Sequence, residues 1–217
     1  PLAGGVAAYA GPDAPVNKIA GLGFAGVPSA DELAAIEQRY HERGAPVLVE
    51  LTSHADPALV AMLAERGYRL SGTENVVGVA LPAVARAPGE VVIEQLAPTA
   101  SLAPWTETLL DGFAAPDDKG VTSTHEFPRD VVREVMLDMA AVDAYACFTA
   151  SVDGVLAGAG GMHVGREVAH MCGAATLPAW RRRGVQSALV RERLTRAAAA
   201  GCRHAVTITQ PGSTSQH

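Results

Sequence analysis

Three consecutive arginines followed by a glycine are the residues with the clearest chemistry in this sequence. Arg181, Arg182 and Arg183 precede Gly184, between a predicted strand and a predicted helix. The backbone N–H groups of a helix's first turn lack partners inside the helix, and the helix dipole adds partial positive charge there. Three arginines at that end are unfavourable unless an anion binds beside them. Because glycine lets a phosphate approach the backbone and arginine matches phosphate oxygens, we predict an anion site at this turn.

Two other interpretations of the turn are a solvated basic surface turn and a nucleotide-binding loop of the P-loop kind. A P-loop needs Lys and then Ser or Thr after its glycine, whereas Val185 and Gln186 follow Gly184. The surface turn remains an alternative, and the strand-to-helix context favours the anion site.

Residues 174–186 resemble the GNAT superfamily of N-acetyltransferases, whose signature opens a helix after a strand. That signature is Gln or Arg, two residues, Gly, one residue, then Gly or Ala. Arg181 and Gly184 match it, and Gln186 departs from it at the last position. Residues 211–216 also resemble a segment of bacterial members. The resemblance covers residues 91–217 and implies an α/β (α+β) GNAT fold, with a central mixed, mostly antiparallel sheet flanked by helices.

The resemblance implies acetyl-CoA as cosubstrate. The sequence has no cluster of residues with the spacing of a metal site, so no metal is expected. The pyrophosphate would contact backbone amides of residues 182–186, and the pantetheine arm would pair like an extra strand with the end of the preceding strand, where side chains are small. The residues expected to bind the cofactor are Ala174, Ala175, Thr176, Arg181, Arg182, Arg183, Gly184, Val185, Gln186 and Ser187.

Acetyl transfer to an amine needs a base for the amine proton and a proton donor for the leaving thiolate. His170 stands eleven residues before Arg181, the offset at which histone-type family members keep a glutamate base. A histidine, with an ordinary pKa of about 6.5, suits that role at neutral pH, so His170 is the expected catalytic residue. The alternative is a strand histidine with a satisfied side chain. Glu167 and Glu126 are further candidates for the base.

The sequence does not identify the proton donor. In the family it is often a tyrosine on the helix after the last strand, which would lie beyond His217; we expect both ends of the chain to be incomplete. Ser213 and Ser215 are interpreted as helix caps. Cys172 suggests a covalent Cys-His mechanism with His170, but no third group orients the pair, so we interpret Cys172 as a small buried residue.

Hydrophobic periodicity and turn signals predict alternating strands and helices along the whole chain. Strands are expected at residues 6–10, 16–23, 47–51, 75–81, 91–96, 144–151, 155–164, 168–176 and 204–210. Helices are expected to end at Gly44 and Gly67 and to span residues 102–113, 129–142 and 185–200. Ser29 and Glu32 form a capping box for the first helix.

The Pro-rich residues 83–89 are predicted to be a linker between a degenerate domain at residues 1–82 and an acetyltransferase domain at residues 90–217. Strand, turn, helix and strand recur in the same order in both, which indicates two GNAT-like halves. The first copy's turn, residues 24–28, has no basic residue and ends in Pro28, so that half should not bind CoA. One continuous domain without duplication is the alternative.

Composition restricts the class of protein. The chain has 217 residues, of which 48% are hydrophobic, enough for a core, and its net charge of -6 argues against coating nucleic acid. Apolar stretches fall well short of the roughly 20 residues of a membrane span, and no leader opens the chain. Cys147, Cys172 and Cys202 suit free thiols in a reducing compartment, which predicts a cytoplasmic protein. His125 and His163 are too scattered for a metal site.

The leading hypothesis is an N-acetyltransferase in which a primary amine attacks acetyl-CoA directly. The alternative is a non-catalytic acyl-CoA-binding or regulatory module, which a missing proton donor would favour. The acceptor is a small-molecule amine or a peptide. A polar loop contains three acidic residues, Asp117, Asp118 and Glu126. They slightly favour a cationic acceptor, although acidic residues in exposed loops usually contact only solvent. A homodimer is also left open.

Overall fold

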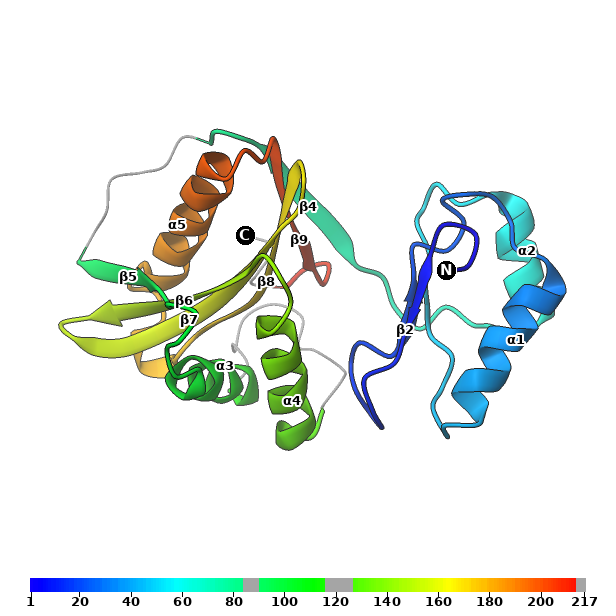
Figure 1. The fold of residues 1–217 in the computed structure, drawn as a ribbon, viewed down its shortest axis with the longest axis horizontal. Helices are drawn as coiled ribbons and strands as arrows, with labels where there is room; N and C mark the ends of the chain where they lie inside the picture. Colours follow the sequence, from blue (N-terminus) through cyan, green and yellow to red (C-terminus); the bar gives the residue numbers. More distant parts are fainter. Residues whose placement is uncertain (84–89, 116–126, 214–217) are drawn as a thin grey trace. The chain divides into compact units, whose positions relative to one another are not determined.

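The computed structural model describes residues 1–83, 90–115 and 127–213 of the chain (Figure 1). Its residue contacts group residues 1–72 with 130–135 in one compact unit, and residues 73–129 with 136–217 in a second. Within the described ranges, no helix has the length and apolar character needed to cross a bilayer.

The first unit is a three-stranded sheet with two helices. Its elements are β1 (Val6–Ala8), β2 (Lys18–Ala20), α1 (Ala30–His41), β3 (Val49–Glu50) and α2 (Pro57–Glu65). β1 is antiparallel to β2, and β2 is parallel to β3. Ile19, Leu33 and Leu59 are fully buried in one cluster, so the sheet and both helices share a core.

One local signal predicted in the first unit is the capping box of α1. The capping box is confirmed, because the Glu32 N–H donates to Ser29 Oγ at 3.2 Å and the Ser29 N–H donates to Glu32 Oε2 at 2.9 Å. Asp56 caps α2 by accepting from the Ala58 N–H at 2.8 Å. The Arg66 guanidinium, hydrogen-bonded to Glu37, holds the pKa of that carboxyl below its ordinary value.

The second unit is built on a six-stranded sheet in the order β4-β9-β8-β7-β6-β5. Its strands are β4 (Asn75–Ala80), β5 (Val91–Gln95), β6 (Tyr145–Val152), β7 (Val155–Val164), β8 (Val168–Thr176) and β9 (His204–Thr209). Its helices are α3 (Ala103–Ala114), the short 3-10 helix η1 (Pro178–Trp180) and α5 (Val185–Ala199). The helix α4 (Arg129–Ala140) is divided, since its residues 130–135 are grouped with the first unit and residues 129 and 136–140 with the second. All neighbouring strands are antiparallel except β8 and β9. The predicted mixed, mostly antiparallel sheet flanked by helices is confirmed.

Helices cover the two faces of this sheet (Figure 1). On one face, Val185 and Leu189 of α5 pack into the core cluster with Phe148 and Met162. On the other face, Trp105 of α3 is fully buried, and its indole N–H donates to the Gly160 carbonyl at 2.9 Å. The sheet is therefore the middle layer of three.

The strand β4 belongs to the second unit. The division between the units therefore lies at residues 72 and 73, whereas the predicted boundary lies at residue 82. β4 pairs with β9 over six positions, from Asn75 opposite Thr209 to Ala80 opposite His204, and the N-terminal segment of the first unit ends at Gly72. The physical reason is that β9 would otherwise present an open edge, which β4 closes by antiparallel pairing. The sequence shows that residues 75–81 form a strand, but not which strand they pair with. Most of the predicted linker, residues 84–89, lies outside the described residues.

Both units contain a strand, a helix and a parallel neighbouring strand, in that order. These are β2-α1-β3 in the first unit and β8-α5-β9 in the second. The first sheet has three strands and the second has six. Duplication of a whole fold therefore stays a prediction.

We expect Gly158→Ala to destabilise the second unit, because a Cβ there would lie 2.8 Å from Val185 Cγ1 and 2.9 Å from the Ala175 carbonyl oxygen. Overpacking of this kind costs about 1–3 kcal/mol of unfolding free energy. Urea unfolding followed by tryptophan fluorescence measures it, since Trp105 and Trp180 both lie in this unit. Gly72→Ala, where a Cβ meets nothing within 4 Å, is the control, expected within about 0.5 kcal/mol of the wild type. Equal stability of both variants would contradict the packing.

Candidate active site

The candidate site begins where β8 separates from β9. The two parallel strands pair at only three positions, from Val168 opposite His204 to His170 opposite Val206. One further link follows, in which the Thr207 hydroxyl donates to the Met171 carbonyl at 3.0 Å. From Cys172 to Thr176, β8 pairs with β7 on one side and with no described strand on the other. This free edge offers backbone N–H and C=O groups to an extended ligand.

A β-bulge lies on the same stretch of β8. Gly161 pairs with Cys172 and Ala159 with Ala175, so the single residue Gly160 lies opposite two, Gly173 and Ala174. Gly173 has φ +52, a left-handed conformation that glycine adopts without strain. Because a bulge bends and twists its strand, this one helps to turn the end of β8 away from β9.

The predicted anion-binding turn lies between β8 and α5. Gly184 is the N-cap of α5, with φ +80 and no side-chain cap, and Arg182 is also left-handed, with φ +61. A Cβ built on Gly184 meets nothing within 4 Å, so the space above it is open. Gln186 and Ser187 in the first turn are exposed, while Val185 is buried and anchors the helix. The uncapped amides at this end can bind an anion.

The three arginine side chains of the turn do different things. Arg181 donates to the Thr176 carbonyl at 3.3 Å, to the Gly112 carbonyl at 3.4 Å and to the Ala115 carbonyl. Its side chain therefore ties the end of α3 to the end of β8. The Arg183 Cζ lies over the Trp180 ring, 5.0 Å from the ring centroid, and Arg182 is exposed.

The space between β8 and β9 beyond Met171 and Thr207 is called the gap here; it is closed at His170 and open towards the turn before α5. Two hydroxyls near its open end have no described partner. Thr176 is the last residue of β8 and Thr209 is the last residue of β9. The Oγ1 atoms of both are buried and form no hydrogen bond to any described residue. Ser213 Oγ is in the same condition. Buried polar atoms normally find a partner, so these oxygens suit a polar ligand in the gap. The free β8 edge, the open turn and these hydroxyls together fit the arm and pyrophosphate of acetyl-CoA.

His170 lies on β8 at the closed end of the gap. It is half-buried, and it lies opposite His163 of β7 and Val206 of β9. Cys172 follows on the same strand, with its thiol 3.7 Å from the Tyr145 hydroxyl. Burial raises the pKa of the Cys172 thiol above its ordinary value, which keeps it neutral and disfavours a nucleophilic thiolate. All three cysteines of the chain are free.

The other candidate bases and donors are placed less favourably or not described. Glu167 is exposed and lies just before β8, at the end of the strand away from the predicted anion-binding turn. Its Oε1 lies 3.6 Å from Arg203 Nη1. Glu126, Asp117, Asp118, His125 and Ser215 lie outside the described residues.

Sequence reasoning missed the polar residues that surround the bulge. Tyr145 on β6 packs against the bulge, Trp105 bonds to Gly160, and Arg193 of α5 is buried beneath the sheet. The available signal was a glycine-rich strand, because Gly160 and Gly161 leave the space that Arg193 and Tyr145 fill.

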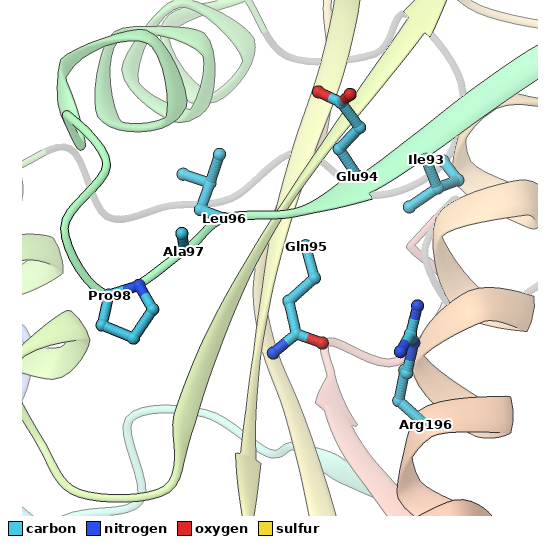
Figure 2. Close-up of a pocket in the computed structure, with 7 residues that line it drawn as sticks. All are labelled: Ile93, Glu94, Gln95, Leu96, Ala97, Pro98 and Arg196. Atoms are coloured by element: carbon cyan, nitrogen blue, oxygen red, sulfur yellow. The ribbon is translucent and has the colours of Figure 1, made fainter.

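A pocket of about 630 Å³ lies elsewhere on the second unit, lined by residues 93–98 and Arg196. Figure 2 shows the Gln95 side chain from β5 and the Arg196 side chain from α5 on its wall. It lies at the C-terminal end of α5 and contains no predicted site residue. The candidate site is therefore not this pocket.

Comparison with known proteins supports the fold. A sequence model of the acetyltransferase (GNAT) family matches residues 113–217. A GCN5-related N-acetyltransferase from Kribbella flavida has a TM-score of 0.60 and 18% identity, over 89% of this chain and 72% of that chain. A functionally unknown conserved protein from Staphylococcus epidermidis ATCC 12228 has a TM-score of 0.57 and 11% identity, over 86% and 71%. A GCN5-related N-acetyltransferase from Sphaerobacter thermophilus has a TM-score of 0.57 and 15% identity, over 84% and 57%.

No curated protein matches the chain. The chain thus carries a GNAT-family domain at residues 113–217, which includes strands β6 to β9, α5 and the anion-binding turn. The solved structures are too distant in sequence to show more than the fold that they share with it.

We expect Arg181→Ala to lower the free energy of unfolding by about 1–3 kcal/mol, because carbonyls at the ends of α3 and β8 lose their donor. Arg183→Ala removes an exposed contact with Trp180 and should cost less than about 1 kcal/mol. Urea unfolding followed by far-ultraviolet circular dichroism measures both. If Arg183→Ala were the more destabilising change, Arg181 would not hold α3 in this way.

Proposed function

We propose that this protein is an N-acetyltransferase that transfers the acetyl group of acetyl-CoA to a primary amine by direct attack. The observation that carries the proposal is the free edge of β8, which leads from the closed end of the gap at His170 to the uncapped amides at Gly184. A cofactor with a long polar arm and a pyrophosphate at its end matches that combination. The GNAT-family domain over the same residues supports it.

In this proposal the turn and the strand edge share the binding of acetyl-CoA. The amides of residues 182–187 and the exposed guanidinium groups of Arg182 and Arg183 hold the pyrophosphate. The backbone of Ala174, Ala175 and Thr176 pairs with the arm, and the Thr176 hydroxyl offers a further polar contact. Arg181 acts indirectly, because its guanidinium is already bound to backbone carbonyls.

Acetyl-CoA, when bound, supplies an activated acyl group as a thioester. The incoming amine forms a new C–N bond as the C–S bond breaks, and the electron pair of the broken bond goes to sulfur. We propose that His170 accepts the amine proton, because it lies at the closed end of the gap and is half-buried rather than fully exposed. The acceptor class proposed is a primary amine of a small molecule or a peptide.

Acetyl-CoA should bind to the wild-type protein in a calorimetric titration, and Gly184→Glu should abolish the binding. The variant places a carboxylate in the open space where the pyrophosphate is proposed to lie, and like charges repel there. Gly154→Glu is the matched control, because Gly154 has a similar φ of +77 and also has nothing within 4 Å of a Cβ. Loss of binding in both variants would indicate a folding defect, and absence of binding in the wild type would refute the proposed function.

His170→Gln should lower kcat/KM about 10²–10⁴-fold in a screen of primary amines, the range for loss of a general base. In the wild type the rate should fall at acidic pH, where histidines become protonated and cannot accept a proton. The variant should lose that dependence. His163→Gln, on the opposite strand, is the control and should retain it. An unchanged acid limb in His170→Gln would rule out His170 as the base.

A further inference from the structure

Arg193 is the only charged side chain among the described residues that is buried, with 2% of its surface exposed. It lies on the face of α5 that packs against the sheet. No described acidic side chain forms an ion pair with it. Burying an unpaired cation costs several kcal/mol, so a feature of this kind needs a compensating interaction.

The guanidinium of Arg193 lies directly beneath the bulge. Its Nη1 donates to the Gly161 carbonyl at 3.0 Å and its Nε to the Leu189 carbonyl at 3.1 Å. A Cβ on Gly160 would lie 3.3 Å from the Arg193 Cζ and 3.4 Å from the Ala174 Cβ. The positive charge is therefore next to the bulged residues of both β7 and β8.

Among the residues that the structure describes, no acidic side chain faces Arg193 across the sheet. Tyr145 of β6 and Cys172 of β8 are the titratable groups that interact with it, and burial raises the pKa of both. Burial also lowers the pKa of Arg193, to about 10, so it remains protonated at neutral pH while its neighbours remain neutral. The other charged or titratable side chains on its helix and the adjoining strands are Arg191, Glu192, Arg196, Glu94, Cys147, His163 and His170. Glu192 pairs with Arg196 instead.

The bulge is also where the proposed cofactor arm would end. The free edge of β8 spans five residues, 172–176, or about 16 Å at the rise of a strand. An arm that starts at the anion-binding turn and follows this edge inward reaches Ala174 and Gly173 before the strands close at His170. The sulfur end of the arm therefore belongs beside the bulge and above Arg193.

We propose that Arg193 is a positioning residue that stabilises the thiolate of CoA. From beneath the bulge it supplies a fixed positive charge for the departing sulfur, and through the Gly161 carbonyl it holds β7, the strand that pairs with β8. This inference rests on the proposed function, because it requires CoA in the gap. In this proposal Arg193, which has no acidic partner among the described residues, interacts with the CoA thiolate, an anion that forms during the reaction.

The test compares CoA with desulfo-CoA, which lacks the thiol, by calorimetric titration from about pH 6.5 to about pH 9. A cation beside a thiol favours the thiolate, whereas burial favours the neutral thiol, as it does at Cys172. The proposal requires the charge of Arg193 to outweigh burial at the sulfur of CoA, so CoA should gain affinity relative to desulfo-CoA as the pH rises. A one-unit lowering of the thiol pKa corresponds to about a tenfold gain. Arg193→Gln should keep both ligands bound and remove most of that gain, and Arg193→Lys should restore it in part.

Arg196→Met is the control, since Arg196 lies three residues along the same helix, is exposed and pairs with Glu192. It should behave as the wild type. Tryptophan fluorescence checks that each variant is folded, and if Arg193→Gln does not fold, the wild-type comparison alone decides. A wild type that binds CoA and desulfo-CoA with the same pH dependence would overturn the role of Arg193 and leave the proposed function standing. A wild type that binds neither would refute the proposed function itself.

Discussion

The separation of β8 from β9 is the constraint on which the rest of the second unit depends. Two parallel strands that pair at three positions and then part leave five residues of backbone without a partner on one side. Such an edge would favour aggregation on the outside of a sheet, but here it lies inside one. β4 keeps the far edge of β9 closed, and the bulge opposite Gly160 turns β8 away. The free edge is thus a feature that the surrounding strands maintain.

Glycines in β7 make this arrangement possible, because they admit large side chains from both faces at one point of the sheet. Gly160 leaves room for Arg193 from the side of α5, and Gly161 leaves room for the Tyr145 hydroxyl from the side of α3. Glycine weakens a strand in general, since it has no side chain to pack and loses more entropy on folding. The buried cation adds a further cost. Several features that lower the free energy of unfolding at one point of the sheet are typical of a functional site rather than of a core that only stabilises the fold.

The three consecutive arginines in the turn between β8 and α5 make different contacts. Arg181 faces inward and fixes the end of α3, while Arg182 and Arg183 remain exposed. Gly184 starts the helix without a side-chain cap, so its amides stay open. The groups of the turn that we propose to bind an anion are therefore the backbone amides and the outer arginines, while Arg181 binds backbone carbonyls of β8 and α3.

The sequence by itself determined nearly every helix and strand, because periodicity, caps and turn glycines are local signals: β7 and β8 have the predicted bounds, and the Ser29 and Glu32 box forms as expected. It also predicted an anion site at the turn before α5, since three arginines before Gly184 conflict with a helix N-terminus within a few residues, and that site stays a prediction. Only the tertiary structure decided that β4 pairs with β9, that Arg181 binds the carbonyls of α3 and that Arg193 is buried beneath the bulge. Each of these is a contact between segments far apart in the chain. A periodic pattern shows which face of a strand or helix is buried, but it does not show which partner meets that face.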